Sequence, residues 1–301
     1  MTDLSTLASK PTSGKTRGTS RTSSKLGRRV WLAISFILMF AASLTMVLPF
    51  VWMLSTSLKN AKDAFSYPPQ WIPEEFDFAN YVEVWEKGPL GAGLLNSAIV
   101  SVLVVGVGTL ASTMAAFAFA KLDFPHKNAA FMMLLASMMI PVVVILVPQF
   151  AIYAKIGWID TLLPLAVPGM LGNVVMIFFL RQYMMGLPGE LMDAAKIDGS
   201  GYFRTYWSIF LPLCKPAIAA NIIIVFMATW NDYLGPLIYT NSPERSTVQL
   251  VIASFVSFYE EQTDLPIVMA ASVIAVLPVL IVFIVLQKHF VNSFALSGIK
   301  G

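Results

Sequence analysis

The sequence predicts an all-α polytopic membrane protein with six transmembrane helices. Of its 301 residues, 57% are hydrophobic and only 12% are charged, and the mean hydropathy is +0.72. Soluble domains average about 25% charged residues and about 45–50% apolar ones. The second observation is the length of the apolar runs, since several reach the ~20 residues that a helix needs to cross a bilayer. Together these observations exclude a soluble enzyme with one apolar patch.

Six runs between charged residues are long enough to span the membrane. Five contain no charged residue and the sixth contains only Asp232; the runs are 30–58, 88–120, 128–154, 161–180, 216–239 and 265–287. Proline within a helix removes a backbone donor and bends the helix. We therefore expect Pro141 and Pro148 to kink the third run and Pro278 to kink the last.

The parts outside the runs set the domain organisation. Residues 1–29 are rich in Ser, Thr, Lys and Arg and contain no aromatic residue, which predicts a disordered basic tail. The six-helix domain is expected over 30–291, and a second tail over 292–301. With an even number of spans, both termini lie on one side of the membrane.

The basic residues indicate which side that is. With the N-terminus inside, 15 of the 20 Lys and Arg residues are internal, and those outside are Lys59, Lys62, Lys87, Lys155 and Arg245. Because loops on the cytoplasmic side carry an excess of Lys and Arg, both termini are predicted to be cytoplasmic. The longest internal loop, apart from the tail, is then 181–215.

The 181–215 loop is predicted to contain two short helices. Pro188 suits a first helical position, and Glu190 and Asp193 place negative charge near the positive end of that helix. Gly199 supplies a left-handed stop. Ser200 is expected to cap a second helix over 201–210, which Pro212 ends.

Two apolar surfaces are expected on these helices. Leu191, Ala194 and Ala195 form a small flat patch on the first helix. The second helix carries a larger aromatic surface: Tyr202, Phe203, Tyr206, Trp207 and Phe210. The aromatic surface is expected to pack on the protein's own helix ends or on lipid. Alanine allows another surface to approach closely, so the first patch suits a partner.

These residues resemble the "EAA" loop of permease subunits of ABC importers. In that loop, Glu-Ala-Ala is followed two residues later by Asp-Gly and then by a Leu-Pro pair. The matching residues here are Asp193, Ala194, Ala195, Asp198, Gly199, Phe203, Leu211 and Pro212. One position departs from the pattern, because Asp193 stands where Glu is usual, which keeps the charge and shortens its reach.

The resemblance extends over nearly the whole chain. The segments that carry it are Ser57-Leu58-Lys59, Pro68-Pro69-Gln70-Trp71-Ile72-Pro73, Asn80-Tyr81, Asn96-Ser97, Trp230-Asn231-Asp232 and Gly298-Ile299-Lys300-Gly301. The sequence is most similar to the six-span subunits of maltose-type carbohydrate importers.

The resemblance implies a division of labour among several chains. It implies a second permease subunit, two cytoplasmic ATPase subunits and an extracytoplasmic solute-binding protein, assembled in a prokaryotic cytoplasmic membrane. The permease forms half of the sugar pathway and is no enzyme itself; its 188–216 segment docks on one ATPase, which carries the ATP and Mg. The sequence agrees with that division, since Gly14-Lys15-Thr16 lacks both the earlier glycine and the preceding strand of a phosphate-binding loop.

Asp232 is a candidate for the substrate pathway because a charge within a membrane span is costly. Counted from Pro216 at ~1.5 Å per residue, it lies ~24 Å along the helix, toward the outer side. Trp230 offers an apolar ring face, and Asn231 and Asp232 offer hydrogen bonds to sugar hydroxyls. The alternative is that Asp232 reaches interfacial water or bonds a neighbouring helix.

Two other functions compete with a sugar-importing permease. An ion-coupled secondary carrier predicts inverted repeats and several intramembrane acids, whereas only Asp232 is found. A membrane scaffold without transport leaves the 188–216 motif unexplained. The sequence also contains one cysteine and two widely separated histidines, which argues against a metal site, and nothing in it indicates nucleic-acid binding.

Overall fold

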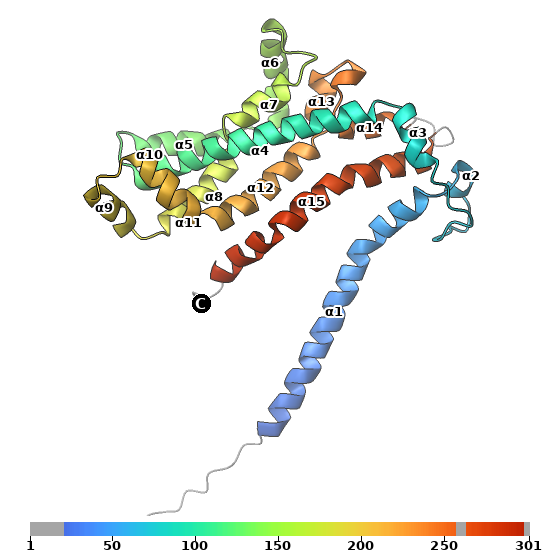
Figure 1. The fold of residues 1–301 in the computed structure, drawn as a ribbon, viewed down its shortest axis with the longest axis horizontal. Coiled ribbons are helices and arrows are strands. Elements are labelled where there is room, and N and C mark those ends of the chain that lie inside the picture. The colour runs from blue at the N-terminus through green and yellow to red at the C-terminus, as the bar shows by residue number, and fades with distance from the viewer. Residues whose placement is uncertain (1–20, 257–262, 298–301) are drawn as a thin grey trace, which may run out of the picture. The chain divides into compact units, whose positions relative to one another are not determined.

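A computed structural model describes residues 21–256 and 263–297, and all its elements in that part are helices (Figure 1). Four of them are long and apolar enough to cross a membrane: Gly27–Thr56, Leu90–Lys121, Leu163–Met185 and Leu265–Lys288. Two bent pairs pass the same test if each pair is one span. The described part of the chain therefore has four candidate spans, or six if each bent pair is one span, and these overlap the six predicted segments. The all-α membrane fold is confirmed.

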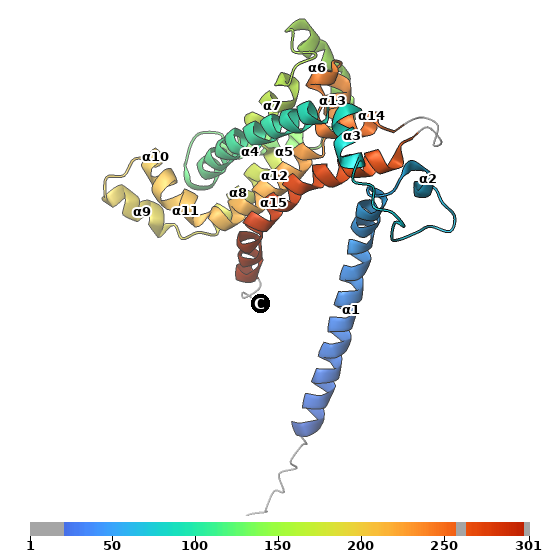
Figure 2. The ribbon, with the colours of Figure 1, turned by 45° about the vertical axis from the view of Figure 1, so that its right-hand side comes forward.

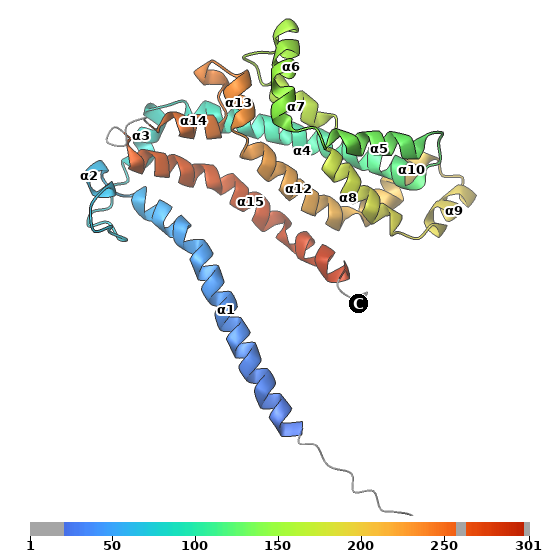
Figure 3. The same ribbon diagram turned by 180° about the vertical axis from the view of Figure 1, so that it is seen from behind.

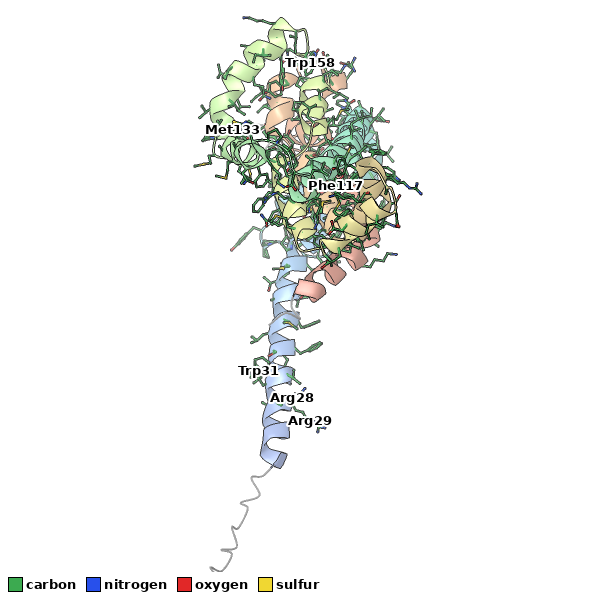
Figure 4. The ribbon with its side chains drawn as sticks, turned by 90° about the vertical axis from the view of Figure 1, so that its left-hand side faces the viewer. Arg28, Arg29, Trp31, Phe117, Met133 and Trp158 are labelled. Carbon is green, nitrogen blue, oxygen red and sulfur yellow. The ribbon has the colours of Figure 1, made fainter. Side chains whose placement is uncertain are left out.

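The chain divides into two units, Met1–Val51 and Trp52–Gly301. The first unit contains most of α1 (Arg21–Thr56), which begins within the predicted tail 1–29; residues 1–20 of that tail lie outside the described residues. Figure 4 shows Arg28, Arg29 and Trp31 near the start of this helix. From Gly27 to Val51 no side chain is buried within the chain. A helix that is apolar all round requires lipid or another protein around it.

The second unit is built around α4 (Leu90–Lys121), with α12 (Lys215–Trp230) between α4 and α15 (Leu265–Ser297) (Figures 1 and 2). On its other side α4 packs against α7 (Leu163–Met170) and α8 (Val174–Met185). A stripe of small polar residues on α4 is buried: Asn96, Ser97, Ser101, Ser112 and Thr113. Small side chains let transmembrane helices approach closely, and hydroxyls bond between them.

Gly108 lies at the closest of these approaches. A Cβ added there would lie 2.4 Å from the carbonyl oxygen of Gly169 on α7, whereas one added at Gly106 would meet nothing within 4 Å. The close packing of α4 against α7 therefore requires glycine at position 108, whereas Gly106 contributes nothing to this crossing.

The third predicted span is broken rather than kinked. Helices α5 (Lys127–Ser137) and α6 (Val142–Lys155) meet at 95°, with Pro141 immediately before α6 (Figure 3). In contrast, α6 continues through Pro148 and α15 continues through Pro278. Pro141 has an extended backbone conformation and lies in the connection between the two helices. The change of direction therefore falls outside both helices.

The fifth span also differs from the prediction of one helix over 216–239. Helix α12 ends at Trp230, and the short α13 (Leu234–Tyr239) follows after three residues. At its other end, α12 meets the helical segment Tyr202–Leu213 at 78°. Asp232 therefore lies in a break between helices and not inside a span.

Short elements cover the end of the second unit away from residues 190–213. They are α2 (Ala61–Ala64), α3 (Asn80–Glu86), a 3₁₀ turn at Pro243–Arg245 (η2) and α14 (Val248–Ser254). The amide of Asn80 donates to the carbonyl oxygens of Ser57 (3.1 Å) and Lys59 (2.8 Å). The ammonium of Lys59 donates to the carbonyl of Gln70 at 2.6 Å and lies 4.3 Å from the ring centroid of Trp52. These bonds tie the 59–88 segment to the end of α1.

Asp160 joins two loops at this end of the unit. Its carboxylate accepts hydrogen bonds from the backbone N–H groups of Asn241 (2.9 Å) and Ser242 (2.8 Å) and from the Ser242 hydroxyl. The Ser242 hydroxyl and amide, followed by the Asn241 amide, lower the pKa of Asp160 from 3.8 to about 2. The bonds favour the charged form, so protonation weakens the connection.

Replacing Asp160 with alanine should release the 241–242 backbone. We expect amide hydrogen exchange at Asn241 and Ser242 to become several-fold faster at neutral pH because both amides lose their acceptor. The folded pKa is depressed, so in the native protein the added protection is complete above about pH 4 and is lost as the pH falls toward 2. Glu244→Ala, in the same turn, is the control. Equal exchange in the Asp160 variant and the native protein would contradict the assignment.

Candidate functional site

The 181–215 segment contains two helices joined at Gly199. The first is α9 (Glu190–Ile197); the second begins with α10 (Tyr202–Thr205) and continues through a π-helical turn, Tyr206–Phe210 (η1), into α11 (Leu211–Leu213) (Figures 1 and 3). Gly199 has φ +68°, which confirms the predicted left-handed stop. That backbone conformation favours glycine because a Cβ crowds the following carbonyl.

Three details of this segment differ from the prediction. Pro188 precedes α9 instead of starting it, since Gly189 is the residue before the first turn. Ser200 does not cap the second helix, because Gly201 is the residue before its first turn; the Ser200 hydroxyl accepts from the hydroxyl of Thr205 at 3.2 Å. Pro212 does not end the helix either. The Leu211 amide bonds the carbonyl five residues back, and this wider turn admits a proline that has no N–H to donate.

Aromatic side chains attach the second helix to α4. Tyr206 and Phe210 are buried, with ring centroids 5.5 Å and 5.1 Å from that of Phe117. Figure 4 shows Phe117 among the helices of the bundle. The hydroxyls of Tyr206 and Thr113 lie 2.8 Å apart, and the Lys121 ammonium donates to the Leu187 carbonyl at 2.8 Å. The segment is therefore held on α4 by ring packing and by hydrogen bonds.

The free surface of the segment is polar with an apolar tip. Asp193, Ala194, Asp198 and Gly199 are exposed, and Ile197 is 86% exposed. Ala195 is buried, so only part of the predicted Leu191–Ala194–Ala195 patch reaches the surface. The predicted aromatic surface is divided in the same way. Phe203 is exposed together with Tyr202 and Trp207, whereas Tyr206 and Phe210 point into the core.

The eight residues predicted to couple with a partner therefore have different environments. Six of them are exposed: Asp193, Ala194, Asp198, Gly199, Phe203 and Pro212. Leu211 is half-buried, and Ala195 packs inward. One helical arm presents charged and small residues while the other is fixed to the bundle. This arrangement can transmit a movement between a docked partner and α4.

A second feature is a cavity of about 240 Å³ among α4, α7, α12 and α13. Its polar lining residues are Ser97, Asn173, Thr229, Asp232 and Thr247. The remaining lining residues are small or apolar, among them Val100, Val104, Gly169 and Pro236.

The structure separates the three residues predicted for the substrate pathway. Asp232 lines the cavity, and its Oδ1 accepts the backbone N–H of Gly235 at 3.1 Å. Trp230 is 3% exposed, with its indole N–H donating to the Ala275 carbonyl at 3.0 Å. Asn231 is exposed and accepts from the amide of Gln249 at 3.0 Å. Neither Trp230 nor Asn231 is among the residues that line the cavity.

Sequence reasoning missed four polar residues of the cavity as site residues. The sequence marks Ser97 only as part of the Asn96-Ser97 pair, which resembles the ABC importer permeases. In the structure both residues bond the backbone of a neighbouring loop. Asn96 donates to the carbonyls of Glu244 and Ser246, each at 2.8 Å, and Ser97 accepts the amide of Val248 at 2.9 Å. A small polar residue inside an apolar run was the available signal for Ser97, Asn173 and Thr229. Thr247 lies outside the runs and had none.

Comparisons with known proteins agree with this architecture. Residues 108–295 match the family model described as "Binding-protein-dependent transport system inner membrane component". The chain is 31% identical over 276 residues to the arabinooligosaccharides transport system permease protein AraQ of Bacillus subtilis, covering 91% of this chain and 96% of that protein. It is 31% identical over 250 residues to the sn-glycerol-3-phosphate transport system permease protein UgpE of Yersinia pestis, covering 81% and 88%.

A solved structure shares the fold. It belongs to a bacterial ABC transporter involved in the import of the acidic polysaccharide alginate. The TM-score is 0.75 at 20% identity, with 91% of this chain and 100% of that chain covered. The family model spans more than half of the chain, and the relatives align over most of their length. The chain therefore belongs to the family of inner membrane components of binding-protein-dependent transport systems.

Proposed function

We propose that this chain is the permease subunit of an ATP-driven sugar importer and that its 181–215 segment couples an ATPase to the membrane helices. Membership of the family supports the transport role over an ion-coupled carrier. Sugar as the substrate is supported by the relative AraQ, whose name gives arabinooligosaccharides.

The observation that carries the coupling role is the way the segment is built. Helix α9 presents Asp193, Ala194 and Asp198 to the surface, and Gly199 joins it to an arm fixed on Phe117 of α4. A displacement of α9 is then transmitted to α4, which contacts α7, α8 and α12. Such a linkage suits a subunit that hydrolyses nothing itself and is moved by a separate ATPase, which carries the ATP and Mg.

The proposed assembly contains a second permease subunit, two ATPase subunits and an extracytoplasmic solute-binding protein. The excess of basic residues in the loops on one side supports an orientation with both termini and the 181–215 segment in the cytoplasm of a prokaryote. The exposed apolar surface of α1 between Gly27 and Val51 supports contact with lipid or the second permease.

The test exploits the left-handed conformation of Gly199. Nothing lies within 4 Å of a Cβ added there, so a larger side chain meets no steric obstacle and acts only through the backbone. Gly199→Val should disfavour the φ of +68° by about 1–2 kcal/mol and move α9 relative to its support. We expect less ATPase to copurify with this subunit and uptake to fall at least about tenfold, as 1.4 kcal/mol of lost coupling predicts.

Gly199→Asn is the matched variant, because asparagine adopts the left-handed conformation more readily than other residues. It should keep both the ATPase and most of the uptake. If valine and asparagine behave alike, or if the valine variant keeps full uptake, Gly199 does not set the geometry of coupling and the proposed role of the segment fails.

The substrate pathway is proposed to pass the cavity that contains Asp232. Asn231 lies beside it in the same break, and Trp230 ends α12 immediately before. With Trp230 buried against Ala275, its contribution is to fix the end of α12, while Asp232 is available to a solute. The second permease subunit supplies the other wall of the pathway.

A further inference from the structure

We propose that the Asp232 cavity selects against anionic solutes, so that the sugar carried by this importer is a neutral polyhydroxyl compound. The inference rests on the proposed function, since it assumes that the cavity belongs to the solute pathway. It names the charge class of the solute, which membership of the family leaves open.

The charge of the lining is the first observation. Asp232 is the single charged residue among the described residues that line the cavity, and no Lys, Arg or His joins it there. Ion pairs within the described part of the chain join Lys87 to Glu83 and Asp264, and Lys127 to Asp123, so none neutralises Asp232. Arg245 is the nearest basic residue in sequence, and it acts on Asp160 instead of lining the cavity.

A phosphate ester or a uronate would therefore meet a carboxylate with no cation in this wall. Sites that bind phosphates and carboxylates present Arg, Lys or clustered N–H donors. Juxtaposed like charges are a means by which proteins reject the wrong ligand. A carboxylate is at the same time a strong acceptor for the hydroxyl groups of a neutral sugar.

The hydroxyl of Thr247 is the second observation. Thr247 precedes the first turn of α14, where a threonine side chain usually accepts an N–H of that turn. Here it makes no such bond, and the amide of Val248 donates to Ser97 on α4. Thr247 is 5% exposed and lines the cavity, and its Oγ1 has no hydrogen-bond partner among the described residues.

Leaving a buried hydroxyl unpaired is unfavourable for folding alone. In this structure the Oγ1 of Thr247 exposes almost no surface, so a solute hydroxyl can pair with it only after the threonine side chain changes rotamer; Thr229 lines the same wall and carries a second hydroxyl. The cavity thus combines hydroxyls that can pair in either direction with one acceptor that carries charge. That combination fits a neutral sugar and disfavours an anion.

The test measures the charge selectivity of the cavity without using transport. Thr229→Cys places a thiol in the lining at a half-buried position, and the native Cys214 is the sole cysteine of the chain and is buried. The complete transporter in proteoliposomes is labelled with methanethiosulfonates that carry neutral methyl, cationic aminoethyl or anionic sulfonatoethyl groups. The rate is read from the intact mass of this subunit. Ala228→Cys, also in the lining, is used if Thr229→Cys does not assemble.

We expect the cationic reagent to react about tenfold faster than the anionic one. This is the ratio that Coulomb's law gives for unit charges of opposite sign placed roughly 6 Å from a carboxylate in a water-like medium. The neutral reagent should lie between them. Asp232→Asn in the same background should bring the three rates together. Glu75→Gln, which removes an exposed carboxylate in the 59–88 segment, should leave the ratio unchanged.

A second measurement addresses the hydroxyl. Thr247→Val should leave the thermal unfolding temperature unchanged or higher, since an unpaired polar group is removed, while uptake at saturating binding protein falls about fivefold through the loss of one hydrogen bond to the sugar. A lower unfolding temperature with unchanged uptake would assign Thr247 to folding alone.

The labelling result stands apart from the coupling experiment on Gly199. Equal rates for anionic and cationic reagents with Asp232 present overturn the charge selectivity, as does a ratio that survives Asp232→Asn. A thiol at both positions that reacts with none of the reagents overturns the cavity as a solute compartment. None of these outcomes alters the role of the 181–215 segment, which ATPase copurification tests separately.

Discussion

Gly108→Ala should destabilise the subunit more than any other single methyl group added to α4. The new Cβ would lie 2.4 Å from the carbonyl oxygen of Gly169, and that obstacle is backbone and not the end of a flexible side chain. Helices α4 and α7 must then separate, at a cost of about 3 kcal/mol, the upper end of the usual range for overpacking. The measurements are the thermal unfolding temperature in detergent and the yield of assembled transporter.

Gly106→Ala is the matched control on the same helix. A Cβ there meets nothing within 4 Å, so the variant should be neutral or more stable by about 0.5–1 kcal/mol through better helix propensity. The comparison isolates the close approach from the general effect of losing a glycine. Similar unfolding temperatures for the two variants would show that α4 and α7 do not cross at Gly108.

Phe210→Ala should detach the 181–215 segment from α4. The side chain is fully buried, packs 5.1 Å from the ring of Phe117, and lies 5.3 Å from the ammonium of Lys121. Truncation of a buried phenylalanine to alanine costs about 3–5 kcal/mol. We expect sugar uptake to be lost and amide exchange in 200–213 to increase, because a movement of α9 no longer reaches α4.

Trp207→Ala provides the comparison, since this ring is 52% exposed and lies in the same π-helical turn. Its removal should leave the exchange of the segment near that of the native protein. Tyr206→Phe, which removes only the hydroxyl bonded to Thr113, should have an intermediate effect of about 1 kcal/mol. Retained uptake in Phe210→Ala would show that the second arm does not transmit the movement.

Local chemistry made parts of the site predictable. The left-handed residue at Gly199 followed from a glycine placed after a run of good helix formers. The start of α9 near Glu190 followed from Pro188 and from acidic residues placed at the positive end of a helix. In contrast, the inward orientation of Ala195 and the division of the aromatic residues depended on where α4 lies, and nothing in the local sequence specifies that.

The cavity shows the same contrast more strongly. Asp232 stood out because a charge in an apolar run is costly. The sequence did not indicate which residues surround it, because Ser97, Asn173 and Thr247 come from segments more than 70 residues apart in the chain. Trp230 was expected to face a sugar, yet in this structure Ala275 on α15 takes its indole N–H. A tryptophan side chain can pack in either direction from a helix end, and the neighbouring helix determines which.

The sequence by itself determined the membrane location, the apolar segments that can span a bilayer, the position of the 181–215 segment and its bend at Gly199. These depend on composition, on the length of apolar runs and on single-residue backbone preferences, all of which act locally. Only the tertiary structure decided that the third span breaks at Pro141, that Gly108 and not Gly106 meets α7, and that the Thr247 hydroxyl remains unpaired in the wall of the Asp232 cavity. Those outcomes depend on which helices meet and at what distance. The same small or polar residue affects packing little where it faces lipid and strongly where two helices cross.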